Sequence, residues 1–213
     1  MTMAEEPSEA LKLNAIDRDY IFLMFALMEC GRALRALEDV QRLAAVKEDR
    51  GEGVERREWI RVFDAIRSAL HFAGSVSRLF FPQTSAGATA RARGERLRHL
   101  TSIPEDHPIS DRALRNHVEH MDERLDIWTA NAPRPFVAVE MRIDPDDAQI
   151  TTDAVEKSSP FLYYTEAQEV VAFGDRFSLP SLSSTLEEVK ARVLSGFDVY
   201  RDEKKAAEQS DKS

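Results

Sequence analysis

The sequence has little of what several protein classes require. Its single cysteine, Cys30, excludes an intramolecular disulfide and a cysteine-based zinc site. Glycine and proline number only 8 and 9 among 213 residues, which excludes collagen-like and wholly disordered chains. The longest strongly apolar run, YIFLMFALMEC at residues 20–30, is interrupted by Glu29 and is too short for a bilayer, which takes about 20 residues. The first residues are acidic and do not resemble a signal peptide, so we expect a cytoplasmic protein without membrane partners.

Positive charge is also scarce. The chain has 29 Lys+Arg against 38 Asp+Glu, a net charge of -9, which argues against binding a polyanion with the whole surface. The acidity is uneven, however: residues 132–213 hold 10 Lys+Arg and 16 Asp+Glu, whereas residues 1–131 hold 19 and 22. Local, salt-sensitive contact with RNA is therefore compatible with the first 131 residues.

Apolar residues recur at helical spacing through those 131 residues. Helices are predicted at residues 15–47, 54–80, 88–101 and 111–130, with glycine or proline between them. In the last helix the apolar stripe is Leu114, Val118, Met121, Leu125 and Trp128. Its spacing is suited to helix-on-helix packing. Trp128 fits this stripe and Trp59 fits the apolar stripe of residues 54–80, so both are expected in the core. Four helices with moderate connections predict a bundle.

The pattern changes after Pro135. Short β-branched and aromatic segments at residues 136–143, 161–165, 169–173 and 176–179 predict a small antiparallel β-meander, followed by a helix near residues 186–200. The expected fold is therefore mainly α. The expected divisions are a disordered segment of residues 1–14, a helical bundle of residues 15–131, an α+β extension of residues 135–203 and a polar tail of residues 204–213.

The motif with the clearest chemistry lies in the fourth predicted helix, in the run RALRNHVEHMDERLDIW. Because the apolar stripe uses Leu114 and its periodic partners, Arg115, Asn116 and His120 fall on the flanks and polar face. Arg115 and His120 are five positions apart, about 140° around a helix, so they would flank a groove. A long arginine side chain can still reach a phosphate that is held near the imidazole.

This Arg-Asn-x-x-x-His run resembles the signature of the HEPN superfamily of helical-bundle ribonucleases and toxins. The resemblance covers residues 15–131 and implies a four-helix HEPN-like bundle in which Arg115, Asn116 and His120 are catalytic. It also implies a metal-independent endoribonuclease without a cofactor, a homodimer formed through the bundle, and an antitoxin protein as a partner.

The chemistry of these side chains agrees with that expectation. A neutral imidazole can take the proton of a ribose 2′-hydroxyl or protonate the leaving 5′-oxygen. A guanidinium such as that of Arg115 can stabilise the charge that gathers on the phosphate. The amide of Asn116 can orient His120 or a phosphate oxygen, because it is both donor and acceptor.

Other interpretations of the sequence remain open. The motif could belong to a non-catalytic helical module that binds a partner protein or a nucleotide, with its charges in ordinary surface pairs. A metal-dependent enzyme using His117, Glu119 and His120 is a further alternative, although catalytic zinc sites have defined ligand spacings that are missing here.

The most basic window of the chain contains Arg91, Arg93, Arg96 and Arg98, with only Glu95 as an acid. One interpretation is a strip that tracks the RNA phosphates beside the catalytic helix. The other is a solvated helix face, which is what most charge runs are.

Overall fold

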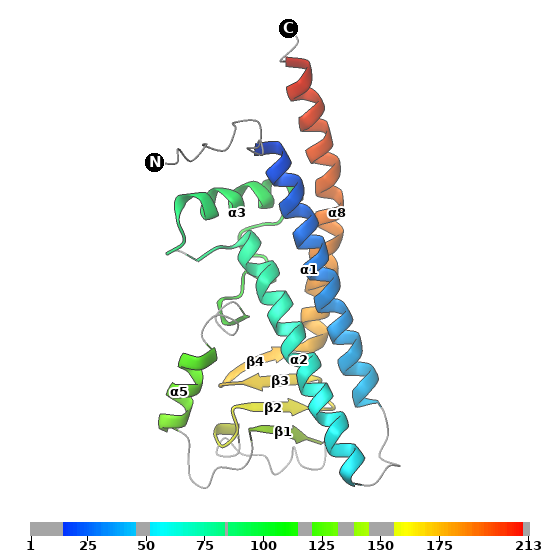
Figure 1. Cartoon of the computed structure of the whole chain (residues 1–213), viewed down its shortest axis with the longest axis vertical. Helices are drawn as coiled ribbons and strands as arrows, with labels where there is room; N and C mark the ends of the chain where they lie inside the picture. The colour runs from blue at the N-terminus through cyan, green and yellow to red at the C-terminus, as the bar shows by residue number, and fades with distance from the viewer. Residues whose placement is uncertain are drawn as a thin grey trace, which may run out of the picture.

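The computed structural model describes residues 15–45, 52–83, 85–114, 121–131, 139–144 and 156–210 (Figure 1). Within these residues the protein is mainly α-helical, with a small four-stranded sheet and a long C-terminal helix, as predicted. The disorder expected for residues 1–14 and the strand residues expected at 136–138 lie outside the described residues.

The first three predicted helices are confirmed. Helix α1 spans Ala15–Ala44, α2 spans Glu52–Phe80 and α3 spans Ala88–Thr101. Helix α3 ends at Ser102, which adopts a left-handed conformation with φ of 52° and donates its N–H to the last helical carbonyls. Local signals set these boundaries, which is why the sequence identified them.

The fourth helix of the bundle is the C-terminal helix and not the predicted one. Helix α8, Leu179–Ser210, packs against α1 and α3 (Figure 1). Its buried positions include Leu186, Val189, Val193, Gly196 and Tyr200, which share one hydrophobic core with α1 and α2. The predicted separation of residues 15–131 from residues 135–203 therefore does not describe the packing, because a single core spans both.

Helix α8 is also longer than predicted at both ends. It starts seven residues before the expected position, with Pro180 in its first turn, where the missing N–H costs nothing. It continues to Ser210, ten residues beyond the predicted end and through most of the expected tail. Alanine, lysine, glutamate and glutamine dominate that stretch, and these residues have high helix propensity.

The other predicted bundle helix lies outside the bundle. Helix α5, Met121–Asn131, has no buried residue and lies beside the ends of β3 and β4 in Figure 1. Met121 and Leu125 are exposed, and Trp128 is only partly buried. The expectation of a core position is therefore wrong for Met121, Leu125 and Trp128, whereas it is confirmed for Leu114, which is 3% exposed and belongs to the core.

The sheet consists of β1 (Glu140–Ile143), β2 (Phe161–Tyr164), β3 (Glu169–Ala172) and β4 (Asp175–Ser178), in that order. Strands β2, β3 and β4 form the predicted antiparallel meander. Strand β1 differs from the prediction because it pairs with β2 in parallel. The 17 residues between them, 144–160, allow the chain to return to the same end of the sheet, which a short hairpin cannot do.

One face of the sheet packs against the hydrophobic core of the bundle. Phe161, Tyr163, Val170 and Phe177 belong to the same core as α1, α2 and α8. Trp59 of α2 packs against Tyr163, with ring centroids 6.2 Å apart. The small sheet is thus attached to the bundle through its apolar face.

Gly94 marks the closest approach of α3 to the end of α2. A Cβ atom at this position would lie 2.6 Å from Cδ of Pro82 and 2.8 Å from the carbonyl oxygen of Phe80. Both distances are shorter than real contacts, and the carbonyl belongs to the backbone. A larger residue would therefore force α3 away from α2.

We expect Gly94→Ala to lower the free energy of unfolding by about 1–3 kcal/mol, the usual cost of overpacking, despite the better helix propensity of alanine. Chemical denaturation monitored by circular dichroism measures this change. Gly87→Ala is the matched control, because a Cβ there meets nothing within 4 Å. Equal stability losses in the two variants would contradict the close approach.

Candidate functional site

The three predicted catalytic residues, Arg115, Asn116 and His120, lie outside the described residues, as do His117 and Glu119. The chain on both sides of them is described. Leu114, directly before the motif, is 3% exposed and belongs to the core. Met121, directly after it, is the first residue of α5. In the sequence, the motif therefore lies between a core residue and the first residue of α5.

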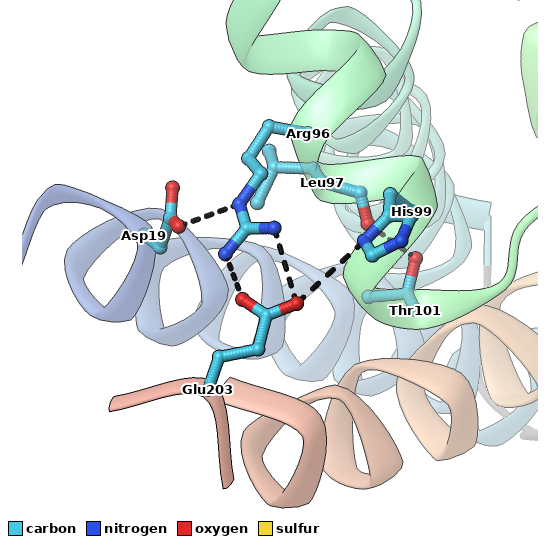
Figure 2. A network of polar contacts seen from close by, with 6 residues as sticks. All are labelled: Asp19, Arg96, Leu97, His99, Thr101 and Glu203. Carbon is cyan, nitrogen blue, oxygen red and sulfur yellow. Dashed lines mark hydrogen bonds and ion pairs between the residues drawn. The ribbon is translucent and has the colours of Figure 1, made fainter. Parts of the chain in front are cut away.

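The predicted RNA-binding arginines are largely engaged within the protein. Arg96 of α3 lies between two acids from opposite ends of the chain (Figure 2). Its Nε donates to Oδ2 of Asp19 at 2.8 Å, and both terminal nitrogens donate to the carboxylate of Glu203. These hydrogen bonds raise the pKa of Arg96 and hold the pKa of Glu203 below its ordinary value of 4.5. Arg96 thus joins α1, α3 and α8.

Arg93 and Arg98 instead face the C-terminal end of α2. Arg93 donates to the carbonyl oxygen of Arg78 at 3.3 Å, and Arg98 donates to that of Phe80 at 2.5 Å. The last carbonyls of a helix carry partial negative charge and need such donors. These two arginines therefore tie α3 to α2.

Arg91 is the exposed member of the strip, and it donates to the carbonyl oxygen of Ala86 at 2.6 Å. The window as a whole is neither a uniform solvated face nor a continuous basic strip. A role for Arg91, Arg93, Arg96 and Arg98 in RNA binding stays a prediction.

A cleft of about 710 Å³ lies between α5, the segment that precedes β2, and β3 with its following turn. Its volume is within the range of about 300–1,000 Å³ that small-molecule sites occupy. The lining residues are Arg124, Ile127, Trp128, Asn131, Glu156, Lys157, Val171, Phe173 and Gly174. The cleft thus combines two aromatic rings with two cationic side chains and one amide.

Arg124 fixes the position of α5 on this cleft. Its Nη1 lies 2.6 Å from Oδ2 of Asp175, and its Nη2 donates to the carbonyl oxygen of Phe173 at 3.2 Å. Its guanidinium carbon lies 5.5 Å from the centre of the Phe173 ring, a cation–π distance. One arginine therefore holds α5 against the turn that joins β3 to β4.

That turn contains an unusual residue. Phe173 and Gly174 have φ values of 51° and 86°, the two positive values that a tight two-residue hairpin turn requires. Glycine and asparagine adopt this conformation readily, but for a bulky residue it costs on the order of 1 kcal/mol or more. The ring of Phe173 packs edge-on against Phe161, with centroids 5.2 Å apart. An aromatic side chain is thus held rigidly in the cleft wall at a position that disfavours it.

The acid in the cleft, Glu156, is already paired. It accepts hydrogen bonds from the hydroxyl of Tyr164 and from Nη2 of Arg176, the latter at 2.6 Å. Burial and the adjacent carboxylate raise the pKa of Tyr164 to about 12. Lys157 is exposed beside Glu156. Arg176 pairs with both Glu156 and Glu169, and Arg124 pairs with Asp175, so both arginines beside this cleft are engaged with carboxylates.

His107 has a structural role. It is 3% exposed, and its Nδ1 accepts the backbone N–H of Ile109 at 3.2 Å. Burial lowers the pKa of its imidazole, because the charged form loses solvation. Its Nε2 lies 3.6 Å from Oε2 of Glu188, so His107 connects the segment that follows α3 to α8.

The cleft has no signature in the sequence. Its walls come from residues 124–131, 156–157 and 171–174, and no local pattern joins these three segments. The one signal that the sequence offers is a phenylalanine before Gly174, where a tight turn normally carries asparagine or aspartate.

In the described segments, no three histidine, cysteine, aspartate or glutamate side chains gather in a way that could hold a metal ion. The alternative ligand set of His117, Glu119 and His120 is outside those segments. Among the helices that are described, none is both long and apolar enough to cross a membrane.

Comparison of the chain with family models, curated proteins and solved structures finds no match. The resemblance to HEPN ribonucleases therefore depends on the Arg115 to His120 motif alone.

The network around Glu203 predicts an acid-dependent stability. Because folding lowers the pKa of Glu203 below 4.5, the network stabilises the protein above that pH, and this stabilisation is lost as the pH falls through the folded-state value. We expect Glu203→Gln to cost up to about 1 kcal/mol at neutral pH and to lose less stability than the wild type between about pH 5 and pH 3.

Urea denaturation at a series of pH values measures both effects. Glu208→Gln, at an exposed position of the same helix, is the control and should retain the wild-type pH dependence. An unchanged acid loss in Glu203→Gln would show that the network is not coupled to folding.

Proposed function

We propose that the protein is a metal-independent endoribonuclease in which Arg115, Asn116 and His120 act on the scissile phosphate. The observation that carries the proposal is the position of this motif, which directly precedes the helix that lines the cleft with Arg124 and Trp128. The residue types agree with the resemblance to HEPN ribonucleases. A cytoplasmic location and a role as a toxin or defence effector, held in check by an antitoxin protein, belong to the same proposal.

The reaction requires no group beyond the chain and the RNA. His120 takes the proton of the 2′-hydroxyl, and the 2′-oxygen attacks the adjacent phosphorus. The bond to the 5′-oxygen breaks, and that oxygen receives a proton, which leaves a 2′,3′-cyclic phosphate and a 5′-hydroxyl. Arg115 stabilises the additional negative charge on the phosphate through paired hydrogen bonds, and Asn116 orients the imidazole or a phosphate oxygen.

Self-association is part of the proposal, and an apolar face of α1 supports it. Ile21, Met24, Phe25 and Met28 lie one helical turn apart and are each 43–46% exposed. Such a contiguous apolar group on a protein surface is typical of an interaction site. We propose that it binds a second copy of the chain.

The spacing of these residues is self-complementary, as a twofold interface requires. In an antiparallel pair of α1 helices with the axis between Met24 and Phe25, Ile21 faces the second copy's Met28, and Met24 faces its Phe25. Every large apolar residue of the face would then be covered.

A non-catalytic module is the second candidate, because the cleft could hold a nucleotide without cleaving RNA. Its lining of aromatic, cationic and amide groups is compatible with either function. Product analysis distinguishes the two.

We expect the purified protein to cleave RNA in the presence of EDTA and to leave 2′,3′-cyclic phosphate ends. His120→Ala should lower the rate by about 100-fold or more, the usual contribution of a general base or acid. Gel analysis of a labelled RNA measures the rate, and circular dichroism checks the fold.

His71→Ala is the matched control, because His71 is exposed on α2. It should cleave at the wild-type rate. RNA bound without cleavage would favour the second candidate, and cleavage unaffected by His120→Ala would remove the proposed mechanism.

For the α1 face, we expect sedimentation velocity to show a dimer at micromolar concentration. Phe25→Glu should weaken it by at least about tenfold, since it places a charge at the centre of the interface. Ile60→Glu is the control, because Ile60 is an exposed apolar residue near the N-terminal end of α2 and outside the proposed interface. This variant should leave the dimer intact. A monomeric wild type, or an unchanged dimer of Phe25→Glu, would rule out this interface.

A further inference from the structure

We infer that His107 is an acid-sensitive latch, which holds the chain between α3 and the motif on the bundle while its ring is neutral and releases that chain when the ring takes up a proton. Residues 103–114 are called the connecting segment below. They directly precede Arg115, so a change of pH acts on the chain that leads into the motif. The inference goes beyond the proposed function and does not depend on it.

The connecting segment is anchored by buried side chains. Ile103 and Leu114 at its two ends are each 3% exposed, and Ile109 in its middle is fully buried. All three belong to the hydrophobic core of the bundle. The regular structure of the segment is a single turn, the 3₁₀-helix η2 of Pro108–Ser110. His107 directly precedes this turn and is a titratable side chain buried among apolar anchors.

His107 holds η2 through a ring nitrogen that carries no proton. Its Nδ1 accepts the backbone N–H of Ile109 at 3.2 Å, which an N–H group cannot do. Its carbonyl oxygen also accepts the N–H of Ser110 at 2.8 Å. A second proton on the ring would place two N–H groups against each other and break the bond to Ile109. Protonation therefore removes the side-chain cap of the turn.

A charged ring would find little compensation in this place. The Nε2 atom of His107 lies 3.6 Å from Oε2 of Glu188, which is longer than a hydrogen bond. Within the described part of the chain, this Nε2 has no hydrogen-bond partner. Glu188 already accepts a hydrogen bond from Nε of Arg192 at 2.8 Å, and Arg192 also donates to the carbonyl oxygen of Ser102. A buried charge without hydrogen bonds is unfavourable, so the protonated ring moves towards solvent.

The electrostatic surroundings of His107 favour the neutral ring. Burial has the largest influence and lowers the pKa of the imidazole below its ordinary value of 6.5. On α8, Glu188 raises this pKa and Arg192 lowers it, and Asp106 of the connecting segment raises it. Helix α2, which also packs against η2, contributes none of these three charges.

These contacts set the direction of the pH dependence. Because the pKa of His107 is lower in the closed segment than in an open one, the open form binds more protons, and acid favours opening. The opening equilibrium constant should rise by up to about tenfold for each pH unit below about 6.5, until the folded-state pKa is passed. The acid loss expected for the Glu203 network occurs at lower pH, because the ordinary pKa of that carboxyl is 4.5.

Hydrogen–deuterium exchange read by mass spectrometry tests the inference between about pH 7.5 and pH 5, with rates corrected for the intrinsic pH dependence of amide exchange. We expect peptides from residues 103–114 to lose protection by up to about tenfold per pH unit below about 6.5. Peptides from α3 should keep their protection. An equal loss in α3 would indicate general unfolding and overturn a local release, and constant protection of the connecting segment would also overturn the inference.

His107→Asn separates the hydrogen bond from the titration. The asparagine oxygen can accept the N–H of Ile109 but has no proton to take up in this pH range. We expect this variant to keep the segment protected down to about pH 5. His71→Asn is the matched control, because His71 is exposed on α2, and it should lose protection as the wild type does. A loss in His107→Asn equal to that of the wild type would assign the effect to another group and overturn the inference.

A measurement on the wild type decides the matter if His107→Asn does not fold. NMR spectra of the histidine ring carbons follow the protonation of His107 in the intact chain. Its proton uptake should coincide with the loss of protection in the connecting segment. Protonation with unchanged protection, or loss of protection while His107 stays neutral, would overturn the inference. RNA cleavage enters none of these measurements, so their outcome is independent of the proposed endoribonuclease.

Discussion

The burial of helix α1 between segments from distant parts of the chain is the constraint on which the rest of the structure depends. Its buried side chains recur from Leu23 to Val40, and both α2 and α8 pack on it. Gly196 brings α8 close to the end of α3, since a Cβ there would lie 3.2 Å from the carbonyl oxygen of Leu100. Arg96 adds a polar connection among α1, α3 and α8 (Figure 2). Long-range packing of this kind couples the two ends of the chain in one cooperative unit.

This arrangement determines where a functional site can form. Because α8 occupies the fourth position of the bundle, α5 has no place in the core and lies against the turn between β3 and β4. Its apolar side chains are therefore left for the cleft and its margins. The chain segment that carries Arg115 and His120 joins a core residue, Leu114, to this displaced helix.

Features that depend on neighbouring residues were predicted correctly, whereas features that depend on residues far apart in the chain were not. Helix α3 was predicted at its observed bounds because glycine, proline and helical periodicity are local signals. The parallel pairing of β1, the placement of α5 and the bonding of Arg96 were missed, since each depends on residues far away in the chain. For Trp128 the apolar spacing was recognised, but spacing alone does not distinguish a core position from the wall of a cleft.

The sequence by itself determined the mainly helical composition, the approximate extent of α1 to α3 and the presence of a small meander. These follow from periodicity, turn chemistry and side-chain type, which are properties of neighbouring residues. Only the tertiary structure decided that α8 completes the bundle, that the basic residues of α3 serve mainly as helix-to-helix contacts, and that a cleft forms beside α5. The physical reason is that several helices compete for the limited apolar surface of α1. Which helices cover that surface depends on the packing of all of them together, and neighbouring residues in the sequence do not reveal it.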